Sequence, residues 1–203
     1  MTKQDLKKRW ENYWYYYKVH TIVFGFVILV MAIMISQCAK KVEPDCKVVL
    51  FTHKNVPSEV VAAMEQELEK FAGDYNGDGK ITVEVVDCSY NPNNPNKNIM
   101  IAQLSKLQGE LGLSESILFI TDIQGFKYLD EQGLFETKDL FPDLDGKGFN
   151  LKNTPFDEAV NKAVPGFFTE DYYILKRTAD RANEEKIRQS EEMLIKLVNA
   201  YSQ

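Results

Sequence analysis

One long apolar run, residues 19–38, constrains this chain more than any other feature of its sequence. It reads VHTIVFGFVILVMAIMISQC, and no charged residue occurs between Lys18 and Lys40. At 1.5 Å per residue, a helix of this length spans about 30 Å, which is the thickness of the hydrocarbon core of a bilayer. The run therefore predicts a transmembrane helix over residues 19–38.

The residues before the run predict its orientation. Residues 1–18 contain five lysines and arginines against only Asp5 and Glu11. Because basic residues beside a span stay in the cytoplasm, we expect a cytoplasmic N-terminus and a single-pass protein of the cell membrane with an extracellular C-terminal domain. Aromatic rings suited to the lipid headgroup layer gather in the same segment. They are Trp10, Tyr13, Trp14, Tyr15, Tyr16 and Tyr17.

Two other fates of the run are open. A cleaved signal peptide has an apolar core of about 7–15 residues that ends in small residues of the A-x-A type. The run is longer, and residues 36–39 (SQCA) are not such a site, so we favour an uncleaved signal-anchor. Residues 35–38 faintly resemble a bacterial lipobox, in which Cys38 would be acylated, although Gln37 replaces the small residue expected there.

A short linker, residues 39–45, leads to residues 46–203, which are long enough for one folded domain. The first twenty residues hold two acidic and five basic residues, which leaves 28 acidic and 19 basic residues in the rest of the chain. This negative charge argues against nucleic acid or an anionic membrane surface as the ligand of the domain. Solubility is its simplest consequence.

Three cysteines occur in the chain, and two of them, Cys46 and Cys88, lie in the predicted domain. Cys46 opens one predicted strand and Cys88 closes the next. In a parallel pair they lie at opposite ends, beyond the Cα separation of about 7 Å that a disulfide allows, so we expect free thiols. His53 is the only histidine outside the apolar run, which argues against a histidine–cysteine metal site.

Strands and helices alternate in the first half of the domain. Short apolar runs predict buried strands over residues 47–52, 81–86 and 117–121. Helical spacing of apolar residues predicts helices between them, over residues 57–73 and 99–111. A β-α-β-α-β order implies parallel pairing with right-handed crossovers. The predicted fold class is α/β, a three-layer sheet of mainly parallel strands with helices on both faces.

The second half of the domain is less regular. We expect a short helix over residues 124–132 and a helix that starts at Thr154 and Pro155. A fourth strand over residues 172–176 and a closing amphipathic helix over residues 184–201 complete the prediction.

The segment SILFITDIQGFKYLDEQGLF, residues 116–135, resembles the first lobe of bacterial extracellular solute-binding proteins. In that family a strand that ends in Asp precedes a short helix and a Gly-Leu pair, matched here by Asp122, Gly133 and Leu134. The resemblance covers roughly residues 46–203 and implies a periplasmic binding protein-like fold that recognises a solute. The family closes two lobes around its ligand, whereas this chain has room for a single lobe.

Polar residues follow the three predicted strands of the first half. Parallel strands bring their carboxyl ends to one edge of the sheet, and doubly wound sheets bind ligands at that edge. We therefore predict a binding rim there. The alternative is that these residues are polar only because the loops after the strands face solvent. The rim residues are Thr52, His53, Asp87, Ser89, Tyr90, Asp122 and Gln124.

A degenerate calcium loop precedes the second predicted strand. Asp74, Asn76 and Asp78 have the spacing of the first oxygen ligands of an EF-hand, and Gly79 stands at its sharp turn. The twelfth position, where a bidentate Glu completes the shell, is Val85. We therefore favour a plain turn over a weak calcium site, and we expect no cofactor.

Motifs of catalysis are absent from the sequence: it has no Gly-x-Ser-x-Gly elbow, no Gly-rich phosphate loop and no His-Glu-x-x-His run. We expect a non-enzymatic, membrane-anchored domain that recognises a small solute or a membrane protein partner. Two alternatives stay open. One is an extracytoplasmic hydrolase that uses His53 with Asp122 and Ser89, and the other is a structural or assembly subunit of a membrane complex.

Overall fold

The computed structural model describes residues 3–38, 43–113, 116–139, 141–178 and 183–202. The chain divides into two compact units, Met1–Glu43 and Pro44–Gln203, each of which is described by itself. Residues 39–42 of the predicted linker lie outside the described residues. Asp45, at the end of that linker, is buried and belongs to the second unit.

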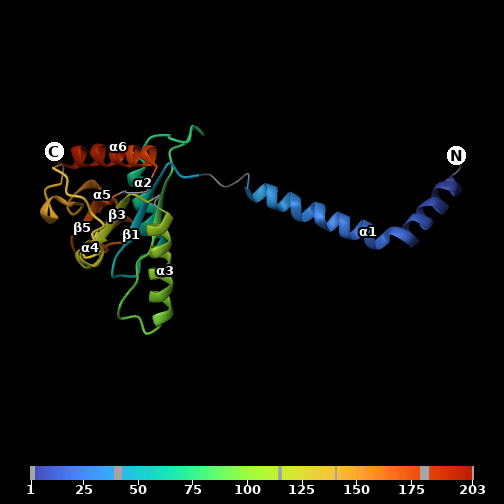
Figure 1. The fold of residues 1–203 in the computed structure, drawn as a ribbon, viewed down its shortest axis with the longest axis horizontal. Coiled ribbons are helices and arrows are strands. Elements are labelled where there is room, and N and C mark those ends of the chain that lie inside the picture. Colours follow the sequence, from blue (N-terminus) through green and yellow to red (C-terminus); the bar gives the residue numbers. More distant parts are fainter. Residues whose placement is uncertain (1–2, 39–42, 114–115, 140, 179–182, 203) are drawn as a thin grey trace. The chain divides into compact units, whose positions relative to one another are not determined.

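The first unit contains a single long helix, α1 (Lys3–Cys38), which bends in its N-terminal half (Figure 1). Its segment Tyr13–Met34 has a mean hydropathy of 2.0, none of it is buried, and it is long enough to cross a membrane. A secretory signal sequence near an N-terminus shares these properties, so the helix fits both interpretations of the apolar run. The side chain of Cys38 lies outside the described residues, as does the lipobox prediction that depends on it.

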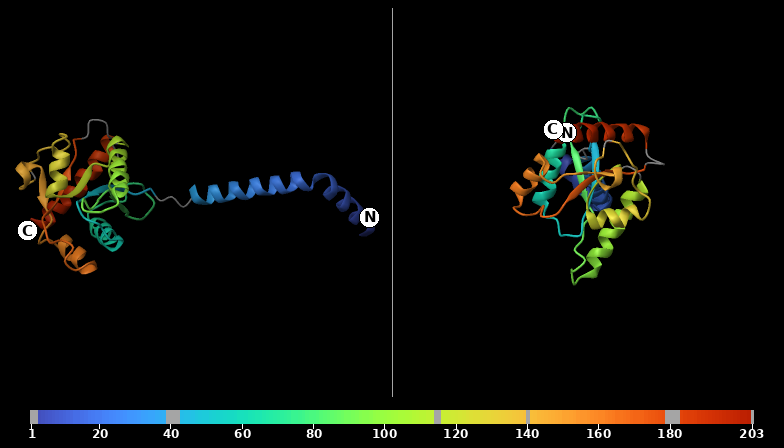
Figure 2. Two further views of the ribbon diagram at one scale, coloured as in Figure 1. Left: turned by 90° about the horizontal axis from the view of Figure 1, so that it is seen from below. Right: turned by 90° about the vertical axis from the view of Figure 1, so that its left-hand side faces the viewer.

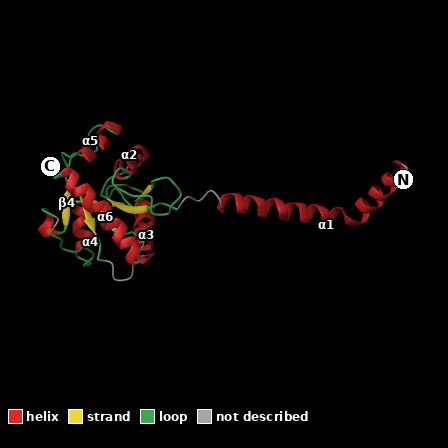
Figure 3. Cartoon of the chain, turned by 90° about the horizontal axis from the view of Figure 1, so that it is seen from above, coloured by secondary structure: helices red, strands yellow, loops and turns green. Residues whose placement is uncertain are grey.

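The second unit is an α/β domain with one five-stranded sheet of order β2-β1-β3-β5-β4, and helices lie around the strands (Figure 3). The strands are β1 (Cys46–Phe51), β2 (Val83–Asp87), β3 (Leu118–Asp122), β4 (Gly148–Asn150) and β5 (Tyr172–Lys176). The helices are α2 (Ser58–Leu68), α3 (Lys97–Leu113), α4 (Ile123–Asp130), α5 (Pro155–Ala163) and α6 (Glu184–Tyr201), with a 3₁₀ turn η1 (Leu144–Gly146).

The sheet is mostly parallel, as the sequence predicts. β1 pairs in parallel with β2 and with β3, in the expected β-α-β-α-β order. β5 runs antiparallel to both of its neighbours, β3 and β4. The sequence does not predict β4, because it has three residues and follows Leu144 and Asp145, which both have a positive φ.

Two clusters of buried side chains hold the helices to the sheet. Along β1 the side chains alternate between them, as they must in a strand: Val48 and Leu50 enter one cluster, and Val49 and Phe51 enter the other. Helices α2, α5 and α6 contribute to the first cluster, and α3 and α4 contribute to the second. Figure 2 shows these helices outside the strands in two further views.

The first turn of α4 packs directly against the end of β1. A Cβ atom added to Gly125 would lie 2.5 Å from the carbonyl oxygen of Phe51, a distance that real Cβ contacts do not show. Glycine at position 125 is therefore a requirement of this close approach. Gly109 in α3 is a helical glycine with open space around the same position.

We expect Gly125→Ala to lower the free energy of unfolding by about 1–3 kcal/mol, because the added methyl group forces α4 away from β1. Gly109→Ala is the matched control and should raise stability by about 0.5–1 kcal/mol through helix propensity. Urea unfolding of the full chain in detergent, followed by circular dichroism, compares the two. Equal effects of the two substitutions would show that α4 does not approach β1 this closely.

Candidate functional site

The structure gathers most of the predicted rim at the carboxyl edge of the sheet. β1, β2 and β3 run parallel, so the residues that follow Phe51, Asp87 and Asp122 lie at the same edge. β1 stands between β2 and β3, so the winding of the chain reverses between β1 and β3. This is the topological switch point, where doubly wound folds bind ligands.

Asp122 joins three segments at the switch point. Its Oδ2 accepts a hydrogen bond of 2.7 Å from the backbone N–H of His53, and its Oδ1 accepts one of 2.6 Å from the backbone N–H of Gly125. Oδ1 also lies 3.3 Å from Nδ1 of the His53 ring. We call these contacts the Asp122 clamp, because they tie the end of β1 and the first turn of α4 to the end of β3.

The clamp determines the charge of Asp122. The side chain is 3% exposed, and burial by itself raises the pKa of its carboxyl group. Hydrogen bonds from the His53 ring and from the N–H groups of His53 and Gly125 outweigh burial, so the pKa lies below its ordinary value of 3.8. Asp122 is therefore ionised at neutral pH, and its negative charge at the N-terminus of α4 stabilises that helix.

His53 is held on both sides of its ring. Nδ1 faces Asp122, and Nε2 lies 3.2 Å from the hydroxyl of Tyr90. A neutral imidazole that donates from Nδ1 and accepts at Nε2 satisfies both contacts. Burial raises the pKa of Tyr90, helped by the nearby Tyr128 and Asp122, so its hydroxyl keeps the proton that it donates. One fifth of the His53 side chain, 20%, remains exposed at this edge.

Ser89 lies next to the clamp but not against the histidine ring. Its Oγ accepts a hydrogen bond of 3.1 Å from the N–H of Thr52 and donates one of 3.4 Å to the carbonyl of Leu50. In the described contacts, Nε2 of His53 meets Tyr90 instead. The arrangement therefore makes Ser89 a link between the ends of β1 and β2, and it does not assemble the triad of the hydrolase alternative.

The two remaining rim residues stand apart from the clamp. Asp87 is half-buried, and its Oδ1 accepts a hydrogen bond of 2.9 Å from the N–H of Ser89, which caps the turn after β2. Gln124 is exposed in the first turn of α4.

Tyr172 is a site residue that sequence reasoning missed. It opens β5 and pairs with Asp122, because β5 runs antiparallel to β3. Thr52 comes one position after Phe51, which pairs with Thr121 of β3, so Thr52, Asp122 and Tyr172 follow one another across three strands. We call this set the hydroxyl row. Only the antiparallel direction of β5 places Tyr172 beside Asp122, and the sequence of a five-residue strand does not indicate its direction.

The hydroxyl row contains two buried oxygens that nothing in the described chain satisfies. Thr52 is 0% exposed and Tyr172 is 1% exposed, and neither hydroxyl has a hydrogen-bond partner among the described residues. A buried hydroxyl without a partner costs about 1–3 kcal/mol. Thr121, one residue before Asp122, also has a buried hydroxyl without a partner among the described residues. Partners for such hydroxyls come from outside the chain, from an ordered water or from a ligand.

Lys54 covers the Tyr172 end of the row. Its Nζ lies 5.4 Å from the centre of the Tyr172 ring and 6.0 Å from that of Phe167, within the range of a cation–π contact. It also lies 3.6 Å from Oε1 of Glu170, which is more than half exposed. Since this ion pair is near the surface, Lys54 can move without a large loss of stability.

The side-chain oxygens of the degenerate calcium loop accept hydrogen bonds from the backbone of the loop itself. The carboxylate of Asp74 accepts hydrogen bonds from the N–H groups of Gly77 and Gly79, and the side-chain oxygens of Asn76 and Asp78 each accept one from the backbone two residues later. These oxygens close a turn. In the described residues, no group of three or more His, Cys, Asp or Glu side chains is placed to hold a metal ion.

Cys46 and Cys88 are both buried and free, as predicted. Cys46 pairs with Val83 at the start of β2, whereas Cys88 follows the end of that strand, so the register places them at opposite ends. Burial raises the pKa of both thiols, that of Cys88 to about 12, so neither is a reactive thiolate at neutral pH.

Comparisons with known proteins do not assign the chain to a family. No family model matches it, and no match is found among curated proteins or among solved structures. The resemblance to solute-binding proteins therefore stays a prediction from sequence.

We expect Tyr172→Phe and Thr52→Val each to raise the free energy of unfolding by about 1 kcal/mol, because each removes a buried hydroxyl that lacks a partner. Urea unfolding of the full chain in detergent measures this change.

Thr154→Val is the matched control for these substitutions. Thr154 is also buried, but its hydroxyl donates a hydrogen bond of 2.6 Å to the carbonyl of Leu151, so this variant should lose about 1 kcal/mol. If Tyr172→Phe lost as much stability as Thr154→Val, the Tyr172 hydroxyl would already have a partner in the folded protein.

Proposed function

We propose that this protein is a single-pass membrane protein whose extracytoplasmic α/β domain binds a small polar solute or a partner protein at the hydroxyl row, without catalysis. The N-terminus is cytoplasmic and α1 is the anchor. The finer fold prediction belongs to the same proposal: the domain is a three-layer sheet with helices on both faces, which its two core clusters support.

The exposure of α1 supports the anchor. Tyr13–Met34 is apolar enough to span a bilayer and none of it is buried in the chain, so its apolar surface needs another environment. The buried core helix of a soluble protein does not have this property. The five basic residues before the run favour a cytoplasmic N-terminus, and the aromatic cluster fits the headgroup layer.

The hydroxyl row is the observation that carries the binding proposal. The switch point is the expected place for a ligand, and there two buried hydroxyls have no partner among the described residues. A solute or a peptide with hydrogen-bonding groups that reaches this edge supplies those partners. This placement agrees with a single lobe of a solute-binding-like protein, which binds at its edge because it has no second lobe to close.

Cysteine labelling tests the anchor and its direction. In a Cys38→Ser background the two remaining cysteines are buried, so a new cysteine reports alone. We expect a membrane-impermeant maleimide to label Ser202→Cys in intact cells and Thr2→Cys only after the cells are permeabilised.

The same chains separate the alternatives for the apolar run. A cleaved signal peptide would remove the label at position 2 from the mature protein. Cleavage before an acylated Cys38 needs that cysteine, so the mass of the mature wild-type chain tests this alternative. Release of the Cys38→Ser chain from membranes by alkaline carbonate would contradict an uncleaved anchor. Labelling of position 2 in intact cells would reverse the proposed orientation.

Thermal shift tests the binding site. The full chain in detergent is screened against amino acids, oligopeptides, sugars and nucleosides, and a ligand that binds the folded state raises the midpoint of unfolding. We expect Tyr172→Phe and Thr52→Val to lose this shift although they are more stable, and Thr154→Val to keep it. A thermal shift that is the same in Tyr172→Phe and Thr52→Val as in the wild-type chain would contradict the proposal. So would the absence of a shift with every ligand class, if the wild-type chain also captured no partner from solubilised membranes that the row variants fail to capture.

A further inference from the structure

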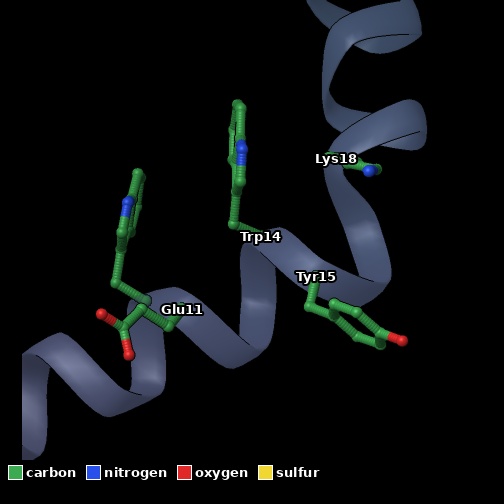
Figure 4. A pocket seen from close by; sticks show the side chains of 5 residues that line it. Glu11, Trp14, Tyr15 and Lys18 are labelled. Carbon is green, nitrogen blue, oxygen red and sulfur yellow. The ribbon is translucent and has the colours of Figure 1, made fainter.

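One face of α1, just before the apolar run, carries two opposite charges between aromatic rings. Trp10, Glu11, Trp14, Tyr15 and Lys18 line an open depression of about 380 Å³. Figure 4 shows four of these side chains, those of Glu11, Trp14, Tyr15 and Lys18, projecting in different directions from the helix where it bends. At 3.6 residues per turn, positions 11, 14, 15 and 18 fall on one face of a helix. This depression, which we call the headgroup face, lies within the first unit alone.

The charges on the headgroup face have a fixed order along the helix. Lys18 directly precedes the apolar run, and Glu11 lies seven residues, or about 10 Å, farther from it. Within the described part of the chain, neither side chain forms an ion pair, so the two charges are available to a ligand. Within this face a cation therefore meets Glu11 far from the hydrocarbon core, and an anion meets Lys18 close to that core. The basic residues Lys7, Lys8 and Arg9 lie farther out along α1.

The aromatic rings favour a cation at the outer end. Trp10 and Trp14 stack with their centroids 6.2 Å apart and their planes inclined by 14°, and both side chains are exposed. Tryptophan is the aromatic residue that binds an ammonium group best, and a carboxylate beside it adds charge attraction. Glu11 lies between the two tryptophans in sequence and lines the same depression.

We propose that the headgroup face binds a zwitterionic phospholipid headgroup, with its ammonium group at Glu11 and the tryptophans and its phosphate at Lys18. In a phospholipid the phosphate is the headgroup charge nearer to the acyl chains and the ammonium group is the farther one, which is the order that this face complements. The order is the same in either leaflet, so the proposal does not depend on which way the helix crosses. It rests on the proposed anchor, because it needs α1 in a bilayer.

The two tryptophans make the test direct. They are the only tryptophans in the chain, and both line the headgroup face, so tryptophan fluorescence reports this site alone. The full chain is reconstituted in vesicles of equal parts phosphatidylethanolamine and phosphatidylglycerol, in which one lipid or the other carries bromine on its acyl chains. Bromine quenches nearby tryptophan, and the ratio of the two quenching values measures which lipid occupies the site.

We expect the wild-type chain to be enriched about two- to five-fold in phosphatidylethanolamine relative to Glu11→Gln, the range that one partly exposed charge contact provides. Lys18→Gln should weaken the quenching by both lipids, because both carry the phosphate. The exchange variant Glu11→Lys/Lys18→Glu keeps the net charge but reverses the order of charges, and it should lose the preference. Tyr16→Phe, outside the face, should leave the ratio unchanged.

Three results would overturn the proposal, and they differ in what else they remove. Equal ratios in the wild-type chain and Glu11→Gln would show that the carboxylate does not select the ammonium group. A preserved ratio in the exchange variant would show that the order of charges does not matter. Quenching by neither lipid would show that no lipid occupies the headgroup face, whereas release of the chain by alkaline carbonate would remove the proposed anchor together with this face.

Discussion

The Asp122 clamp is the interaction on which the carboxyl edge of the domain depends. One buried carboxylate fixes the backbone of β1 where it leaves the sheet, the first turn of α4 and the ring of His53. Gly125 allows this only because it has no Cβ to meet the carbonyl of Phe51. Without the clamp, no contact of Asp122 would join the segments that follow β1 and β3, and Thr52 and Tyr172 would not flank a fixed carboxylate.

A second buried carboxylate performs the same task at the opposite edge. Asp45 accepts hydrogen bonds from the N–H groups of Tyr75, Asn76 and Thr82, and these bonds outweigh burial so that its pKa also lies below the ordinary value. The calcium-like loop is thus folded around a carboxylate of the chain itself. Both carboxylates have their partners within the chain. Beside Asp122, the hydroxyls of Thr52 and Tyr172 are in addition buried without a partner among the described residues.

Local sequence patterns predicted much of this domain, because its long elements have clear periodicity. Tyr172–Lys176 and Glu184–Tyr201 form the strand and the helix expected there, and the β-α-β-α-β order gave the shared edge where Thr52, His53 and Asp122 meet. The direction of β5 was beyond such reasoning, because strand direction is a tertiary property. Tyr172 could not be assigned to the site for that reason. Ser89 shows the converse: it lies at the predicted edge, but its hydroxyl is used by the backbone.

The two units of the chain present different chemistry to different surroundings. The Tyr13–Met34 segment of α1 offers exposed apolar and aromatic side chains with a single charged residue, Lys18. The domain is acidic and buries its apolar residues in two clusters. The helix has the length and hydropathy to cross a membrane, as a signal sequence also has, and the charge of the domain favours contact with water. The proposed function follows from that contrast together with the unsatisfied hydroxyls at the carboxyl edge.

Native-state hydrogen exchange of the backbone amides of His53 and Gly125 tests the central claim most directly. Both amides donate to Asp122, and both lie at the ends of elements, where exchange is fast unless a specific partner protects the amide. The clamp predicts strong protection of both amides in the wild-type chain and its joint loss in Asp122→Ala, with the interior of β1 still protected. Exchange of His53 and Gly125 at the rate of exposed loop amides in the wild-type chain would contradict the clamp and the site that is built on it.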